Sequence, residues 1–115
     1  MDLQIVQQDS VTIVTITGPS LDASNNREFV ETFSPLMIPE ARIIFNMCHL
    51  RFVDSSGLGS MMLCLRRLGA SGDMLKLCGL SKSVQALFEL VRMNRVFDIY
   101  RTSEEAVQAL KSNQG

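Results

Sequence analysis

The stretch that decides the fold is residues 42–68, RIIFNMCHLRFVDSSGLGSMMLCLRRL. It opens with a nearly continuous apolar run, Arg42 to Cys48, which is typical of a strand covered on both faces. It closes with an amphipathic pattern, in which Arg66 and Arg67 lie opposite an apolar stripe at helical spacing. The stripe consists of Leu58, Met61, Met62, Leu65 and Leu68. A strand, a short polar loop and a helix in this order indicate an α/β domain.

Further strands and helices are expected on both sides of this stretch. Short β-branched runs at 3–6 and 11–17 predict a hairpin, and apolar runs predict strands at 74–78 and 97–100. Helical spacing predicts helices over 26–37, over 82–91 after a cap at Ser81, and from Thr102 or Ser103 through 110. Ser20 or Asp22 would cap the first of these helices, and Pro39 would end it.

We therefore predict a single α/β domain with a mixed sheet of four or five strands and about four helices. The domain would cover residues 1–111, followed by a short tail at 112–115. In such a sheet the loops that follow the parallel strands gather at one end, where function usually collects. Asp54-Ser55-Ser56-Gly57 is one of these loops.

Composition argues against several classes of function. With 46% hydrophobic and 20% charged residues, the chain has the balance of an ordinary globular domain. A net charge of −1 argues against a nucleic-acid partner. No apolar run is long enough to cross a bilayer and the N-terminus lacks a signal peptide, so we expect a cytoplasmic protein without membrane insertion. The three cysteines, Cys48, Cys64 and Cys78, are expected to be buried reduced thiols, and with one histidine we expect no metal site.

The DSSG loop has the chemistry of a phosphate-tolerant helix start. A serine before a helix is most often an N-cap, worth about 1 kcal/mol. Here one of Ser55 and Ser56 could cap while the other faces outward, and Gly57 and Gly59 would leave backbone N–H groups open to an anion. A phosphate beside Asp54 would bring a charge of about −1.5 to −2. A partner that fits the unphosphorylated surface would then no longer bind, while the fold would be preserved.

Common catalytic patterns do not fit this loop. A GxSxG elbow would need glycine where Val53 or Asp54 stands, and the chain contains no GxxxxGK[ST] phosphate loop. The spacing of His49 from the two serines does not favour a catalytic triad. We therefore expect no catalytic residues, no enzymatic activity and no cofactor.

These residues resemble the STAS domain family, in particular its stand-alone bacterial anti-sigma factor antagonists. Residues 52–59, FVDSSGLG, are similar to the family signature F-[IVM]-DS-[ST]-GLG. Gly18 with the following LDA at 21–23 resembles the family's G-x-LD-A stretch. Residues 77–81, 84–90 and 96–100 resemble its later strand, helix and closing strand, so the resemblance covers nearly the whole chain.

The resemblance implies a phosphorylation switch. In the family, an anti-sigma factor that is itself a serine protein kinase phosphorylates the second hydroxyl residue of the signature, which is Ser56 here, with Ser55 as its neighbour. The unphosphorylated form binds the anti-sigma factor and frees the sigma factor; phosphorylation blocks this binding and a phosphoserine phosphatase restores it. The environment of the phosphosite would consist of Asp22, Asp54, Gly57, Leu58 and Gly59. Asn46 stands where family members often carry an aspartate that bears on kinase pairing, although a strand-end role is the commoner one.

The partner surface is expected at Ala23, Ser24, Met61 and Met62. Because successive helix positions point in different directions, the two methionines cannot lie at the same depth. Core packing is the ordinary role of methionine, and our hypothesis is that one of the two is exposed. Two alternatives stay open: a STAS subunit of a lipid or anion transport system or sensory complex, and a STAS module that binds a nucleotide at the helix start.

Overall fold

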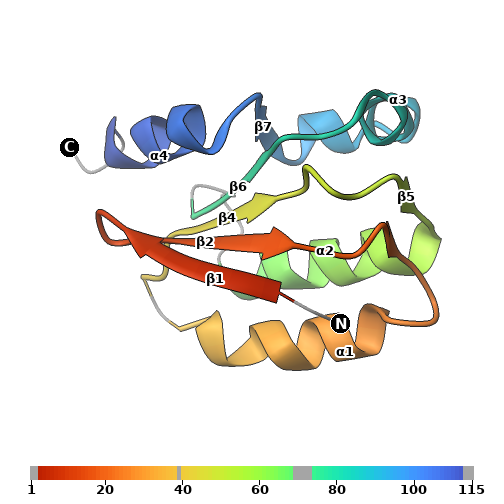
Figure 1. The fold of residues 1–115 in the computed structure, drawn as a ribbon, viewed down its shortest axis with the longest axis horizontal. Helices are drawn as coiled ribbons and strands as arrows, with labels where there is room; N and C mark the ends of the chain where they lie inside the picture. The colour runs from red at the N-terminus through yellow and green to blue at the C-terminus, as the bar shows by residue number, and fades with distance from the viewer. Residues whose placement is uncertain (1–2, 39, 69–73, 113–115) are drawn as a thin grey trace.

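The computed structural model describes residues 3–38, 40–68 and 74–112 (Figure 1). Strands and helices follow one another along the chain after an N-terminal hairpin. The elements are β1 (Leu3–Gln8), β2 (Val11–Ile16), β3 (Ser20–Leu21), α1 (Asn26–Phe33), the 3-10 turn η1 (Ser34–Leu36), β4 (Ile43–Asn46), β5 (Phe52–Val53), α2 (Ser55–Leu68), β6 (Leu75–Cys78), α3 (Lys82–Leu90), the 3-10 turn η2 (Met93–Arg95), β7 (Asp98–Tyr100) and α4 (Ser103–Ser112).

The main sheet has five strands in the order β1-β2-β4-β6-β7. β1 is antiparallel to β2, and all other neighbours are parallel. The predicted mixed sheet with about four helices is therefore confirmed. β3 and β5 form a separate parallel pair that the sequence did not predict, because two residues are too few to give a periodic signal.

The predicted hairpin joins β1 to β2 through a two-residue loop. Asp9 and Ser10 have φ angles of 53° and 68°, and Gln8 pairs directly with Val11. Two consecutive positive φ angles are those of a type I′ turn, whose twist matches that of the flanking strands. The loop therefore fixes the register of the whole hairpin.

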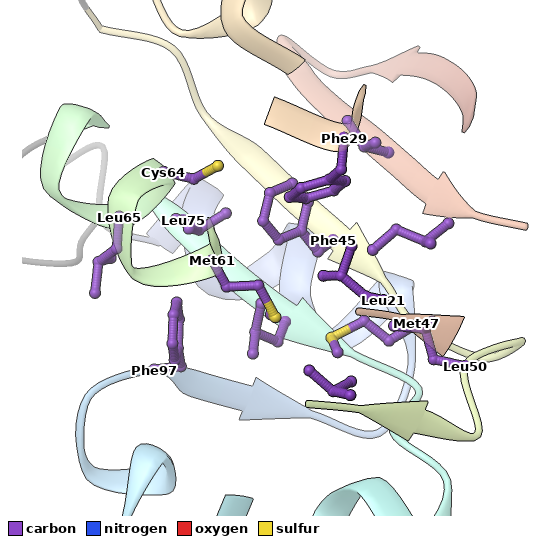
Figure 2. Close-up of a cluster of buried hydrophobic side chains, with 14 of the residues drawn as sticks. Leu21, Phe29, Phe45, Met47, Leu50, Met61, Cys64, Leu65, Leu75 and Phe97 are labelled. Carbon is purple, nitrogen blue, oxygen red and sulfur yellow. The ribbon is translucent and has the colours of Figure 1, made fainter. Parts of the chain in front are cut away.

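Helices cover both faces of the sheet. α1 and α2 pack on one face (Figure 1), where the ring of Phe45 lies 5.5 Å from that of Phe29 and 4.8 Å from that of Phe33, centroid to centroid. Figure 2 shows Met61 and Cys64 of α2 reaching into the same core. The other face packs against α4, in a smaller cluster made of Val11, Ile13, Ile44, Cys78, Ala106, Val107 and Leu110.

Several predicted boundaries and caps differ from the structure. The first helix ends earlier than expected, and its N-cap residue is Asn25 rather than Ser20 or Asp22. Ser81 does cap α3, by accepting a hydrogen bond from the N–H of Val84, and α4 runs to Ser112, one residue past the expected end of the domain. Pro39, which was expected to end the first helix, lies outside the described residues, as do residues 113–115 of the expected tail.

The prediction that all three thiols are buried is wrong for one of them. Cys64 and Cys78 are buried, and burial raises the pKa of each thiol to about 12. Cys48 is exposed, because it lies beyond the end of β4, in the turn that leads to β5. The apolar residues around Cys48 in the sequence were therefore not a sufficient reason to predict that its side chain is buried.

Candidate functional site

The site begins with the short parallel pair β3 and β5. Leu21 pairs with Val53, and the N–H of Asp54 donates to the carbonyl of Leu21 at 3.2 Å. Each of these strands leads into a helix, β3 through residues 22–25 into α1 and β5 through Asp54 into α2. Two loops that are about 30 residues apart in the sequence therefore lie side by side.

Asp54 links the two loops and caps α2. Its Oδ1 accepts hydrogen bonds from the hydroxyl of Ser56 at 2.6 Å and from the N–H of Gly57 at 2.9 Å. Its Oδ2 accepts from the N–H of Ala23 in the neighbouring loop, at 3.1 Å. The carboxylate thus occupies the helix end, where the unpaired N–H groups favour negative charge.

The hydrogen bond from the Ser56 hydroxyl, followed by that from the Gly57 N–H, holds the pKa of Asp54 below its ordinary value of 3.8. The carboxylate is consequently ionised at neutral pH. The expectation that a serine caps this helix is wrong, since an aspartate does so. The N–H of Gly57 is likewise taken up by Asp54 rather than left open to an incoming anion, which argues against the nucleotide alternative.

Asp22 organises the neighbouring loop in the same way. Its Oδ1 accepts from the N–H and the hydroxyl of Ser24, at 2.9 and 2.5 Å, and its Oδ2 accepts from the hydroxyl of Ser20 at 3.0 Å. The hydroxyl of Ser24 is the main cause that lowers the pKa of Asp22, while the negative charge of Asp54 acts in the opposite direction. The carboxylates of Asp22 and Asp54 therefore interact electrostatically across the site.

The two serines of the loop differ in their surroundings. Ser55 is exposed, whereas Ser56 is half-buried. The carbonyl of Ser56 accepts a hydrogen bond from the side-chain amide of Asn26 at 3.3 Å, and its hydroxyl donates to Asp54. Ser56 is thus the serine that contacts both the cap of α2 and the start of α1. The sequence did not single out Asn26, because a helix-start asparagine has many ordinary roles.

The two glycines near the start of α2 have different environments. A Cβ on Gly57 would lie 2.3 Å from the carbonyl oxygen of Leu21, so glycine is required there by the close approach of α2 to β3. A Cβ on Gly59 would meet nothing within 4 Å, and this position is exposed. The expectation that both glycines serve anion access therefore gives way, at Gly57, to backbone packing.

The expected partner surface loses one of its four residues. Met61 is fully buried in the core (Figure 2), so the expectation that it belongs to this surface is wrong. Met62 is half-buried and shares a helix face with Ser55 and Gly59, since Gly59 follows Ser55 by four residues and Met62 follows Gly59 by three. Ala23 and Ser24 are exposed on the neighbouring loop, and Leu58 is half-buried between the surface and the core.

Phe52, the first residue of the FVDSSGLG stretch, lies in β5 and pairs with Ser20 of β3. It stands two residues before Asp54 and is 55% exposed, because the alternation of β5 turns Val53 inward instead. An exposed ring of this size next to a loop built from polar contacts is a candidate contact residue. No sequence pattern could have revealed it, since a phenylalanine in a short strand is usually buried.

Asn46 lies at the end of β4, and its side-chain oxygen accepts a hydrogen bond from the N–H of Cys48 at 3.3 Å. This contact agrees with the strand-end role. Within residues 3–38, 40–68 and 74–112, no cluster of three or more histidine, cysteine, aspartate or glutamate side chains could hold a metal ion. None of the helices in those segments is long and apolar enough to cross a membrane.

A sequence model described as the STAS domain matches residues 2–106. The chain belongs to the STAS domain family. The match includes the loops that carry Asp22 and Asp54, so the site described above lies within the matched residues. The resemblance inferred from the FVDSSGLG stretch is therefore confirmed.

Known relatives of this STAS domain include anti-sigma factor antagonists. It is 24% identical over 112 residues to BtrV of Bordetella bronchiseptica, assigned as an anti-sigma factor antagonist, and the match covers 97% of each chain. A Planctomyces limnophilus STAS protein, an anti-sigma factor antagonist, has a TM-score of 0.83 at 17% identity over 94% of this chain and 96% of the other.

The anti-sigma factor antagonist SpoIIAA has the same fold in two states. Its unphosphorylated form matches with a TM-score of 0.75 at 22% identity, covering 96% of this chain and 97% of the other. The phosphorylated form, from Bacillus, matches with a TM-score of 0.66 at 24% identity, covering 93% and 97%. At these identities the structural likeness establishes the fold.

Proposed function

We propose that this STAS domain is an anti-sigma factor antagonist that is switched off by phosphorylation of Ser56. The observation that carries the proposal is the 2.6 Å hydrogen bond from the Ser56 hydroxyl to Asp54, whose carboxylate also caps α2 and holds Ala23 of the neighbouring loop. This assignment is supported by the similarity of the chain to BtrV and to SpoIIAA, whose structure in the phosphorylated form has the same fold. We expect the domain to act in the cytoplasm, without enzymatic activity of its own.

The geometry suggests how phosphate transfer to Ser56 proceeds. The hydroxyl already donates its hydrogen to Asp54, so this carboxylate is positioned to accept the proton as the serine oxygen attacks the γ-phosphorus of ATP on a bound kinase and ADP leaves with the bridging oxygen. A depressed pKa makes Asp54 a weak base but keeps it ionised, and its main effect is then to orient the hydroxyl. The kinase would be the anti-sigma factor, and a phosphoserine phosphatase would reverse the step.

A phosphate on Ser56 would compete with Asp54 for the helix end. It removes the donor of the 2.6 Å hydrogen bond and adds a charge of about −1.5 to −2 beside the carboxylate. The repulsion weakens the contacts of Asp54 with Gly57 and Ala23, so the loop at residues 22–25 is released together with the cap. A partner that contacts both loops therefore loses its surface, while the core beneath α2 is unchanged.

The phosphorylation test uses the two adjacent serines as a matched pair. The protein is incubated with its candidate kinase and ATP, and phosphate is located by mass spectrometry in the wild type, in Ser56→Ala and in Ser55→Ala. We expect label on Ser56 in the wild type and in Ser55→Ala, and none in Ser56→Ala. Label on Ser55 would refute the acceptor assignment, and the absence of label with every candidate kinase would refute the switch.

The partner surface is proposed to consist of Ala23, Ser24, Gly59 and Met62, with Phe52 at its edge. Met62→Glu places a charge on the exposed helix face and is expected to weaken binding of the anti-sigma factor at least tenfold, with an unchanged melting temperature. Ile38→Glu is the matched control, because Ile38 is 61% exposed and follows η1, at the end of α1 remote from Asp54. Unfolding of Met62→Glu would mean that this side chain belongs to the core.

A further inference from the structure

β1 forms one edge of the main sheet, and its outer side has no strand neighbour among the described residues (Figure 1). Five of its six residues are exposed, including Ile5 at 45% and Val6 at 56%. The strand reads LQIVQQ and carries no charge and no proline. Natural proteins usually protect long edge strands with charges, prolines or bulges, and none of these devices is present in β1.

The hairpin geometry determines which backbone groups of β1 face outward. In an antiparallel pair, hydrogen-bonded and non-hydrogen-bonded residue pairs alternate, and the pair Gln8 and Val11 that closes the two-residue loop is of the hydrogen-bonded kind. Gln7 and Thr12 are then a non-hydrogen-bonded pair. In agreement, the N–H of Thr12 points away from β1 and donates to the carbonyl of Arg42 at 2.8 Å.

The same alternation along β1 turns the N–H and C=O groups of Leu3, Ile5 and Gln7 to the outer edge. These three residues are placed symmetrically about Ile5. A second copy of β1 can be placed beside the first by a two-fold axis perpendicular to the sheet. Ile5 then pairs with Ile5 and Leu3 with Gln7 of the other copy, and paired side chains lie on the same face of the joined sheet. All three outward residues are then used, in six inter-strand hydrogen bonds.

We propose that β1 is a homodimerisation edge, at which two copies of this chain join their sheets through antiparallel β1 strands about an axis at Ile5. The edge is uncharged, so two copies do not repel each other, and Ile5 packs against its own counterpart on the face covered by α1. Because the strand is only six residues long, the contact is smaller than the roughly 800 Å² per partner of stable complexes. The dimer is therefore weak, with a dissociation constant in the micromolar range or above.

The dimer leaves the candidate functional site free. Asp22 and Asp54 lie in loops that follow β3 and β5, and neither belongs to the outer edge of β1. The inference is therefore independent of the proposed switch: a loss of dimerisation leaves Ser56 and its partner surface intact, and a failure of phosphorylation leaves the dimer intact.

The test is sedimentation velocity from low micromolar to millimolar protein, on the wild type, Ile5→Lys and Leu90→Lys. We expect the wild type to shift from monomer to dimer and Ile5→Lys to raise the dissociation constant about tenfold or more, because two lysines would lie directly opposite each other. Leu90, in α3, is 81% exposed and lies outside the hairpin, so Leu90→Lys should dimerise as the wild type does. A wild type that stays monomeric throughout would overturn the proposal, as would an Ile5→Lys variant that dimerises unchanged.

Amide hydrogen exchange provides a second readout that does not depend on a variant. The outward N–H groups of Leu3, Ile5 and Gln7 should gain protection as the protein concentration rises. The N–H groups of the even-numbered residues of β1 point to β2 and should be protected equally at every concentration. A dimer whose formation leaves the odd-numbered amides unprotected uses another surface, and would refute the β1 interface.

Discussion

Gly57 and Gly59 provide a matched pair of alanine substitutions that tests the architecture of the site. A Cβ at Gly57 would lie 2.3 Å from the oxygen and 2.9 Å from the carbon of the Leu21 carbonyl, both of them backbone atoms of β3. A Cβ at Gly59, two residues further along α2, would meet nothing within 4 Å. We therefore expect Gly57→Ala to destabilise the domain and Gly59→Ala to stabilise it.

The magnitudes follow from the neighbouring atoms. At Gly57 the helix and β3 must separate by about 1 Å to reach ordinary contact distance, and overpacking of this kind costs about 1–3 kcal/mol. The shift also strains the bond from the Asp54 N–H to Leu21, worth about 1 kcal/mol. Alanine recovers up to about 1 kcal/mol of helix propensity at either position. The net expectation is a loss of about 2 kcal/mol for Gly57→Ala and a gain of about 0.5–1 kcal/mol for Gly59→Ala.

Thermal and denaturant unfolding, followed by circular dichroism, measure both variants. For a domain of this size about 4 °C corresponds to 1 kcal/mol, so we expect the melting temperature of Gly57→Ala to fall by about 8 °C and that of Gly59→Ala to rise by a few degrees. Equal effects of the two alanines, or a larger loss at Gly59, would refute the close approach of α2 to β3. A stable Gly57→Ala protein would also remove the physical reason for glycine in the loop.

Three further predictions concern the remaining polar contacts. Because hydrogen bonds hold the pKa of Asp22 and of Asp54 below 3.8, the folded chain binds fewer protons than the unfolded chain in this range. Their contribution to stability is present above about pH 4 and is lost as the pH falls. In a variant with both aspartates changed to asparagine, the free energy of unfolding in urea should therefore fall less steeply with acid than in the wild type. Lys76 is buried, and its ammonium lies 2.6 Å from a carboxylate oxygen of the exposed Asp98. In urea unfolding, Lys76→Met should change the free energy of unfolding by less than about 1 kcal/mol. Asp98→Ala should cost more, because it leaves the buried ammonium without its partner. Ser81→Ala should cost about 1 kcal/mol in the same assay through loss of the α3 cap.

The sequence predicted the main sheet because its strands and helices carry strong periodic signals. The apolar run at 42–48 contains β4, and the stripe from Leu58 to Leu68 covers α2. The apolar run buries Ile43, Ile44, Phe45 and Met47, and the five residues of the stripe lie in the core or pack against it, so pattern and packing agree. The first helix was predicted too long, since Phe33 and Leu36 keep helical spacing while the chain has already tightened into the turn η1.

The site was predicted only in part, because its geometry depends on a contact that leaves little trace in the sequence. Asp22 and Asp54 were both expected near the phosphosite, and the structure brings their loops together. What joins them is the pairing of Leu21 with Val53 in two strands of two residues each. The depth of Met61 and Met62 likewise depends on how α2 is rotated about its axis, which spacing alone left open.

The roles of Ser55 and Ser56 follow from which group caps α2. Had a serine been the cap, its hydroxyl would have been committed to a backbone N–H, and the other serine would have been free in solvent. Asp54 takes the cap instead, and the hydroxyl of Ser56 becomes a donor to that same carboxylate. A modification of this one hydroxyl would therefore act on the helix end and, through the hydrogen bond from the Ala23 N–H to Asp54, on the second loop. Ser55 is exposed to solvent, whereas the Ser56 hydroxyl contacts the carboxylate that caps α2, which is the physical reason to propose Ser56 rather than Ser55 as the phosphorylated residue.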